Sequence, residues 1–102
     1  MAVTNAYLNS IRQTMIDKVD HAQFKIGNSY TRAEIKEKRI NSNGTVTIGF
    51  NITVSASATI TQCRLRDANG NVLATKAENI SMSATANAVY YFFTFNVYEL
   101  VT

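Results

Sequence analysis

The sequence predicts a mainly β fold: a small antiparallel β-sandwich of about six strands, or a curled sheet of the same size, with one N-terminal α-helix. Three observations support this. Apolar and polar residues alternate without a break from Val46 to Val54, which is typical of a half-buried strand. Apolar residues recur every three or four positions between Leu8 and Val19, as in an amphipathic helix. Turn sequences such as Asn43-Gly44 separate the strands at hairpin distances, which favours antiparallel pairing.

The chain is expected to form a single domain, 1–102, that begins with a helix over residues 5–18. Thr4 is the expected N-cap, since its hydroxyl can accept a hydrogen bond from the first turn. Arg12 falls outside the apolar stripe. A single helix of this length is marginal in water, so the stripe has to pack against other elements. The stripe consists of Leu8, Ile11, Met15, Ile16 and Val19.

An antiparallel β module is expected over residues 22–98, starting with a short alternating strand that ends at Gly27-Asn28. Residues 31–40 leave two interpretations open. Thr31 and Glu34 have the spacing of a helix capping box, and Glu, Lys and Arg are good helix formers. The segment also leads into the Asn-Gly turn and would supply the partner that the next strand needs. We therefore favour a strand here.

The next two strands are expected at 46–54 and 58–66. Gly49, on the polar face of the first, indicates a close backbone approach or a bulge. In the second, the apolar positions shift out of register near Thr61-Gln62, which indicates a β-bulge.

A turn at 67–71 is expected to lead into a short strand at 72–76. A polar connection carrying Ile80 and Met82 would then reach the final strand at about 88–98.

The final strand is apolar on both faces. Val89, Tyr91, Phe93, Phe95 and Val97 alternate on one face, and Tyr90, Phe92 and Tyr98 lie on the other. A strand of this kind is normally covered on both sides. We therefore predict that Tyr90, Phe92 and Tyr98 lie in or beside a subunit interface.

The predicted core combines the helix stripe with the inward positions of the strands. It comprises Leu8, Ile11, Met15, Phe24, Ile26, Val46, Ile48, Phe50, Ile52, Leu65, Val89, Tyr91, Phe93 and Phe95.

The net charge is +3, and charged residues make up only 17% of the chain. Glu34 and Glu37 lie inside the most basic run, whereas nucleic-acid-binding proteins usually concentrate cations with few acids among them. The basic run is expected to be a solvated face, and binding of nucleic acid is not expected.

The cysteine and hydropathy patterns point to a reducing compartment and to no membrane insertion. Cys63 is the only cysteine, so no disulfide can form within the chain. No apolar run approaches the ~18 residues of a membrane span. The N-terminus lacks the basic and apolar segments of a secretory signal.

The residues capable of chemistry are too scattered to predict an enzyme. His21, the only histidine, is expected to follow the helix and interact with its last carbonyls. Cys63 is expected to be an inert core thiol. Asp67, Asn69 and Asn71 have alternating oxygen ligands, but a calcium loop needs a downstream glutamate that is missing, so a plain turn is favoured. We predict no catalytic, cofactor-binding or metal-binding residues.

Several segments carry a family resemblance in the same order along the chain. They are Met1-Ala2-Val3-Thr4-Asn5, Leu8-Asn9-Ser10-Ile11-Arg12, Phe24-Lys25-Ile26-Gly27, Gly44-Thr45-Val46-Thr47-Ile48, the segment from Ala58 to Ala74, and Tyr90-Tyr91-Phe92-Phe93-Thr94-Phe95-Asn96-Val97. Together they resemble small structural proteins of tailed bacteriophages and prophages. Two departures stand out: Gln62-Cys63-Arg64 replaces a glutamate-x-glycine of the family, and the segment after Gly27 is shorter.

The resemblance implies a non-enzymatic virion protein, made in the bacterial host cytoplasm. Such proteins form tail, neck, baseplate or fibre-attachment parts by oligomerising, in a ring or trimer, and docking on other virion proteins. Two alternatives are a capsid decoration (cement) protein and a small carbohydrate-binding β-sandwich for recognition of the host surface.

Overall fold

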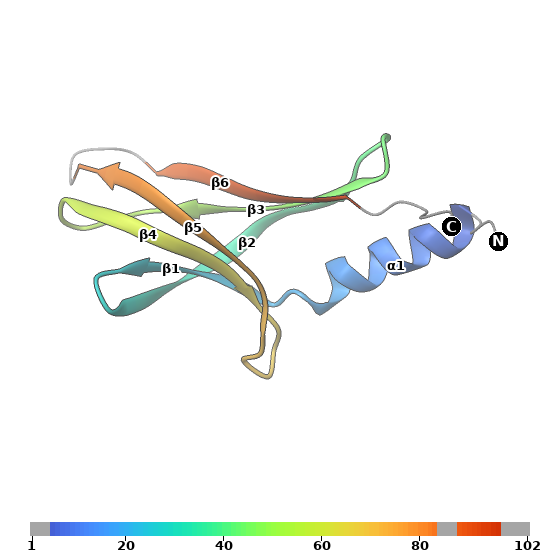
Figure 1. The fold of residues 1–102 in the computed structure, drawn as a ribbon, viewed down its shortest axis with the longest axis horizontal. Coiled ribbons are helices and arrows are strands. Elements are labelled where there is room, and N and C mark those ends of the chain that lie inside the picture. The colour runs from blue at the N-terminus through green and yellow to red at the C-terminus, as the bar shows by residue number, and fades with distance from the viewer. Residues whose placement is uncertain (1–4, 84–87, 97–102) are drawn as a thin grey trace.

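The computed structural model describes residues 5–83 and 88–96, which form one helix followed by six antiparallel strands (Figure 1). This confirms the mainly β fold with an N-terminal helix. Helix α1 spans Asn5–Lys18, as the apolar periodicity predicts. The strands are β1 (His21–Ile26), β2 (Ser29–Ile40), β3 (Thr45–Ile52), β4 (Ala58–Arg66), β5 (Val72–Met82) and β6 (Val89–Asn96). The predicted N-cap Thr4 and interface residue Tyr98 lie outside the described residues.

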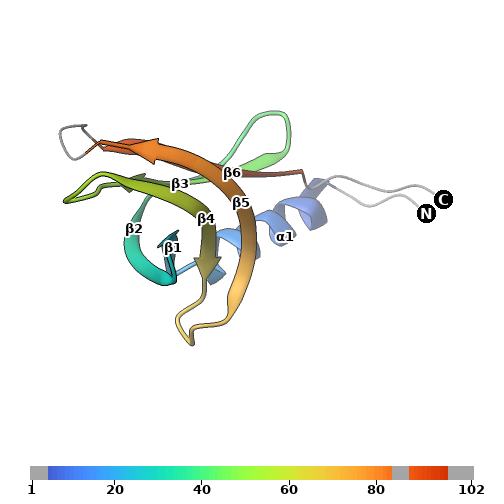
Figure 2. The ribbon, with the colours of Figure 1, turned by 60° about the vertical axis from the view of Figure 1, so that its left-hand side comes forward.

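The six strands form one sheet in the order β5-β4-β1-β2-β3-β6, so β5 and β6 are its two edges. The sheet is curled, and both edges lie on the same side of the molecule (Figures 1 and 2). They converge where β5 ends and β6 begins, and they separate toward their other ends. Near the convergent end, the Tyr91 hydroxyl on β6 donates a hydrogen bond to Glu78 on β5 at 2.8 Å. The curl therefore encloses a core that a flat sheet of the same strands would leave open.

The core lies on the concave side of the sheet. Phe50 is fully buried, and its ring lies 5.5 Å from that of Tyr91 and 6.5 Å from that of Phe93. Of the predicted core, the buried members are Leu8, Phe24, Val46, Ile48, Phe50, Ile52, Leu65, Tyr91 and Phe93. Buried residues that the prediction omitted include Val19, Ala22, Ala33, Ile60 and Met82.

One residue of the predicted core is wrong, and four others are only half-buried. Ile11 is 37% exposed. Ile11 lines the open groove between α1 and the sheet, so it stays partly exposed, whereas Leu8, one turn nearer the N-terminus, is buried. The half-buried members are Met15, Ile26, Val89 and Phe95.

Arg12, placed outside the apolar stripe by the periodicity, is in fact only 8% exposed. Its guanidinium packs against Gly44 in the β2–β3 hairpin and donates a hydrogen bond to Asn9 at 2.7 Å. A side chain at position 44 would overlap the guanidinium, and the φ of +87° there also favours glycine. The hairpin and the helix are thus fitted to each other.

The ambiguous segment 31–40 is a strand, as favoured from the sequence. Strand β2 pairs with β1 through one half and with β3 through the other, which outweighs the helical propensity of its Glu, Lys and Arg residues. Lys38 also donates a hydrogen bond to the carbonyl of Val19 at 2.6 Å, which ties β2 to the segment after α1.

The bulge expected near Thr61-Gln62 is confirmed, because the pairing of β4 with both neighbours shifts register there. The predicted boundary of the next strand is wrong. Strand β5 runs to Met82, and the expected polar connection is part of it. Its distal half is held by pairing: Ile80 lies opposite Ile60, and Met82 lies opposite Ala58. Packing of these inward side chains outweighs the weak strand propensity of the Ala-Glu-Asn segment before them.

Candidate interaction surface

Two aromatic side chains lie exposed beside each other on the outer face of edge strand β6. Tyr90 is 45% exposed and Phe92 is 52% exposed. Their ring centroids are 6.1 Å apart, with the planes tilted by 34°. We call Tyr90 and Phe92 the outer aromatic pair. The structure thus brings together two of the three residues predicted for an interface.

Tyr90 lies across the sheet because Gly49 of β3 leaves room for it. Gly49 is buried, and a Cβ at this position would overlap the Tyr90 hydroxyl. The hydroxyl reaches past Gly49 and donates a short hydrogen bond to Glu37 of β2. This hydrogen bond raises the pKa of Tyr90, since the carboxylate favours the protonated phenol. The group that approaches Gly49 is a side chain and not the backbone expected from the sequence, and it fixes one ring of the pair. The alternative, a bulge, agrees with the register shift between Ile35 and Glu37 in the β2–β3 pairing, where Glu37 lies opposite Gly49.

Polar groups border the outer aromatic pair on β2 and β3. Asn51 lies directly opposite Tyr90 in the β3–β6 register, and Phe92 lies opposite Gly49. Glu37 also pairs with Arg39 at 2.6 Å. The surface thus combines two apolar rings with amide, carboxylate and guanidinium groups at its border.

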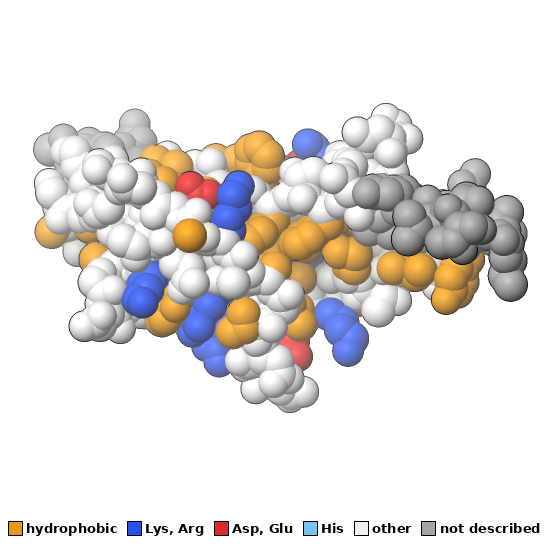
Figure 3. Space-filling view, in the orientation of Figure 1, with side chains coloured by type: hydrophobic (Ala, Val, Ile, Leu, Met, Phe, Trp, Pro, Cys, Tyr) orange, Lys and Arg blue, Asp and Glu red, His pale blue; other side chains and the backbone are white. Residues whose placement is uncertain are grey.

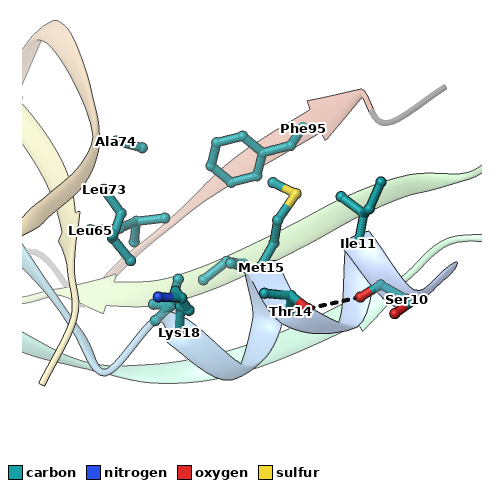
Figure 4. Close-up of a pocket in the computed structure, with 11 residues that line it drawn as sticks. Ser10, Ile11, Thr14, Met15, Lys18, Leu65, Leu73, Ala74 and Phe95 are labelled. Carbon is teal, nitrogen blue, oxygen red and sulfur yellow. Dashed lines mark hydrogen bonds between the residues drawn. The ribbon is translucent and has the colours of Figure 1, made fainter. Parts of the chain in front are cut away.

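A second apolar surface is the groove between α1 and the sheet, with a volume of ≈ 370 Å³. Phe95 of β6 and Leu73 of β5 face Met15 and Ile11 of α1 across it (Figure 4). Leu73 is 41% exposed. Hydrophobic side chains gather on this face between the sheet and the helix (Figure 3). The sequence prediction missed the groove, although the adjacent apolar residues at 72 and 73 break the strand alternation and were a signal for it.

The outer face of β1, β2 and β4 is polar and basic. The Arg64 guanidinium stacks over the Tyr30 ring, with its carbon 3.6 Å from the ring centroid. Arg64 also donates a hydrogen bond to Gln23 at 2.7 Å. Arg32 pairs with Glu34 at 2.8 Å on the same face. Its acids and cations are interleaved, in agreement with the solvated face expected for the basic run.

The prediction for His21 is wrong in its placement. His21 is the first residue of β1 and does not cap the helix; Val19 and Asp20 separate it from the end of α1. Its Nδ1 lies 2.8 Å from the Asp20 carboxylate, and in the sheet register it lies between Glu34 and Arg66. Within residues 5–83 and 88–96, no cluster of three His, Cys, Asp or Glu side chains could hold a metal ion.

The loop between β4 and β5 is a plain turn, as favoured from the sequence. The Asp67 carboxylate accepts hydrogen bonds from the backbone N–H groups of Asn69 and Asn71 at 2.9 and 2.8 Å. The Asn71 side-chain amide donates another at 3.0 Å. The hydrogen bonds from Asn71 lower the pKa of Asp67, since they stabilise the carboxylate. Both carboxylate oxygens of Asp67 are thus engaged in holding the turn.

Cys63 is fully buried on the concave side of β4, as predicted. Burial raises the pKa of its thiol to about 11, because the thiolate would lose its hydration. Burial likewise raises the pKa of Tyr91, whose hydroxyl also donates to Glu78.

We expect Cys63 to be unreactive in the folded protein. At pH 8, a thiol of pKa about 11 forms far less thiolate than an unperturbed one of pKa ≈ 8.5, so a disulfide reagent should label the native chain at least about 100-fold more slowly than the unfolded chain. The chain has no other cysteine, so the absorbance of the released thiolate reports this site alone. Similar rates for the native and urea-unfolded protein would contradict the inert assignment.

No helix within the described parts of the chain has the length and apolar character needed to cross a membrane. Comparison with known proteins found no matching family model, no matching curated protein and no matching solved structure.

Proposed function

We propose that this protein is a non-enzymatic structural subunit of a bacteriophage particle, which acts by self-association and by docking on other virion proteins. The observation that carries the proposal is the outer aromatic pair, two half-exposed rings side by side on an edge strand. Aromatic residues are enriched at protein interfaces, where an apolar ring contributes buried area at a small entropic cost.

The scarcity of surface charge supports self-association. Only 17% of the chain is charged, and β6 itself carries no charged residue from Val89 to Asn96. Exposed apolar rings on a small protein with few charges favour association over the monomer. Tyr90 and Phe92 would thus be covered by a neighbouring subunit.

The location in the particle rests on the sequence resemblance to small phage structural proteins. A tail, neck, baseplate or fibre-attachment part is favoured, with capsid decoration as the alternative. Synthesis in the host cytoplasm fits a chain whose only cysteine is a buried thiol. A ring or trimer is the expected assembly, with a dimer as the alternative, because virion parts usually meet through cyclic symmetry.

Carbohydrate binding is the second candidate, and one observation favours it. The outer aromatic pair has Asn51 opposite Tyr90, and Glu37 and Arg39 on the next strand. Sugars bind to such surfaces by stacking on aromatic rings and by hydrogen bonds to neighbouring polar groups.

Phe92→Asp tests the proposal, and we expect it to raise the dissociation constant for self-association at least tenfold, equivalent to about 1.4 kcal/mol. The carboxylate would be desolvated in the interface without a partner. Light scattering over a concentration series measures the mass, and thermal melting checks the fold. Thr59→Asp, an exposed position on β4, controls for the added charge.

Two results would decide against the proposal. Self-association is ruled out if the wild type is monomeric at all concentrations and Phe92→Asp changes neither the mass nor the melting temperature. Binding of a glycan by the monomer, lost in Phe92→Asp and kept in Thr59→Asp, would establish the carbohydrate-binding alternative instead.

A further inference from the structure

Edge strand β6 lacks the protection that exposed sheet edges usually have. Among the described strands it pairs only with β3, in an unbroken register from Val89 to Asn96. It contains no charged residue, no proline and no bulge. The opposite edge, β5, carries Lys76 and Glu78, and its pairing with β4 shifts register twice. Charges and bulges are the usual means of preventing edge-to-edge pairing, and β6 has neither.

Within residues 5–83 and 88–96, only one half of this edge is open to another chain. The two edges converge where β6 begins (Figure 1), and Tyr91, the third residue of β6, is tied to β5 through its hydrogen bond to Glu78. From Phe92 to Asn96 the edges separate, and the groove lined by Phe95, Leu73 and Met15 opens between them (Figures 1 and 4). The free segment Phe92–Asn96 has Thr94 at its midpoint.

We propose that Phe92–Asn96 pairs with the same segment of a second copy of this chain, antiparallel and about a two-fold axis at Thr94, so that the two sheets become one. The inference rests on the proposed self-association and specifies its contact as that of a two-fold dimer, in place of the ring or trimer expected from the resemblance.

The register has a direct structural consequence. Thr94 lies opposite Thr94 of the other copy, Phe93 opposite Phe95, and Phe92 opposite Asn96. Residues opposite each other in an antiparallel pair point to the same face. Phe93 and Phe95 of both copies therefore share the concave side, and Phe95, which lines the groove with Ile11 and Leu73, brings the groove into the contact.

The area needed for a stable contact favours this arrangement. Two rings exposed by about half offer on the order of 200 Å² per copy. A stable interface buries about 800 Å² per partner, so the outer aromatic pair is too small by itself. Pairing at the β6 edge adds backbone hydrogen bonds and the groove residues to the same contact.

Charge and symmetry favour a second copy as the occupant. The chain carries a net charge of +3, but Arg32 and Arg64 lie on the face of β1, β2 and β4, away from β6. Arg39 of β2 lies in the same cross-strand row as Thr94, and its charge is paired with Glu37 at 2.6 Å. Two copies can therefore meet at β6 without charge repulsion. In a two-fold dimer the β6 edges of both copies are paired with each other. Pairing of β6 with β5 of the next copy would instead build an open row of subunits with an unpaired edge at each end.

Single cysteines introduced into the wild-type chain test the register. Thr94→Cys should give a disulfide-linked dimer under mild copper-phenanthroline oxidation, because opposite Cα atoms in such a pair are about 4.5–5.5 Å apart. Phe92→Cys should not link to itself, since the two copies of position 92 would be about 14 Å apart. Phe92→Cys mixed with Asn96→Cys should link. Thr75→Cys, exposed on edge strand β5, is the matched control, and buried Cys63 gives the background.

Thr94→Lys provides a second readout. It should weaken association at least tenfold without lowering the melting temperature of the monomer, while Thr75→Lys leaves association unchanged. The proposal is overturned if Thr94→Cys links no faster than Thr75→Cys, or if Phe92→Cys links to itself. A chain that oligomerises and responds to Phe92→Asp, but shows no Thr94 cross-link, would refute edge pairing and leave the proposed function intact. A strictly monomeric chain would refute both.

Discussion

Phe50→Ala is expected to lower the free energy of unfolding by about 3–5 kcal/mol, the usual cost of removing a buried phenylalanine ring. Phe50 is fully buried on β3, which lies between β2 and the edge strand β6. Its ring contacts Tyr91 and Phe93, so truncation leaves a cavity beneath both. Chemical denaturation monitored by circular dichroism measures the change.

Phe92→Ala is the matched control, since it makes the same deletion on β6 at a residue that is half-exposed. At protein concentrations where the chain is monomeric, it should cost less than about 1 kcal/mol. Equal costs for the two substitutions would mean that the concave side of the sheet does not form the main core.

The regular elements could be predicted where the pattern is local. The alternation at Val46–Val54 predicted β3, because each inward residue of a half-buried strand has to be apolar. The apolar periodicity from Leu8 predicted α1, because the side of a surface helix that packs on the core has to be apolar every three or four residues. In β2 the local signals disagreed, and the turn at Asn43-Gly44 decided correctly because it required a partner strand.

The errors arose where distant contacts determine the outcome. Strand β5 continues to Met82 because β4 offers it a partner, and nothing in the Ala-Glu-Asn segment itself indicates this. The exposure of Ile11 and the burial of Arg12 depend on where α1 crosses the sheet. That position follows from the curl and from the β2–β3 hairpin, which a helical periodicity does not contain.

The candidate surface was predicted in composition but not in geometry. The two-sided apolar pattern of β6 correctly indicated that Tyr90 and Phe92 would lie together outside the core. The contact of the Tyr90 hydroxyl with Glu37 joins residues far apart in the chain and needed the strand order β2-β3-β6. Gly49 had been recognised as unusual, but only the register shows which side chain uses its space.

Gly49→Ala is expected to disrupt the outer aromatic pair from beneath, without changing a residue of the pair. The new methyl group would overlap the Tyr90 hydroxyl, so the ring has to swing away from the sheet and lose its hydrogen bond to Glu37. Because Tyr90 is exposed and can move outward, the monomer should lose less than about 1 kcal/mol of stability. Alanine also lowers the conformational entropy of the unfolded chain, which offsets part of this loss. Self-association should weaken at least tenfold, because the displaced Tyr90 ring no longer packs beside Phe92, which lies in the proposed contact.

Two measurements separate this effect from general damage. The hydrogen bond from Tyr90 to Glu37 raises the phenol pKa, so its loss in Gly49→Ala should lower the pKa of Tyr90 toward the usual value near 10, measured from the ring signal by NMR titration. Tyr90→Phe, which lacks the hydroxyl but keeps the ring, assigns that signal. In a Tyr90→Ala background, Gly49→Ala should have no further effect on association, since the overlapping group is gone. If Gly49→Ala weakens association equally with and without the Tyr90 ring, the glycine acts through the backbone of β3, and the fixed pose of Tyr90 is not what the neighbouring subunit recognises.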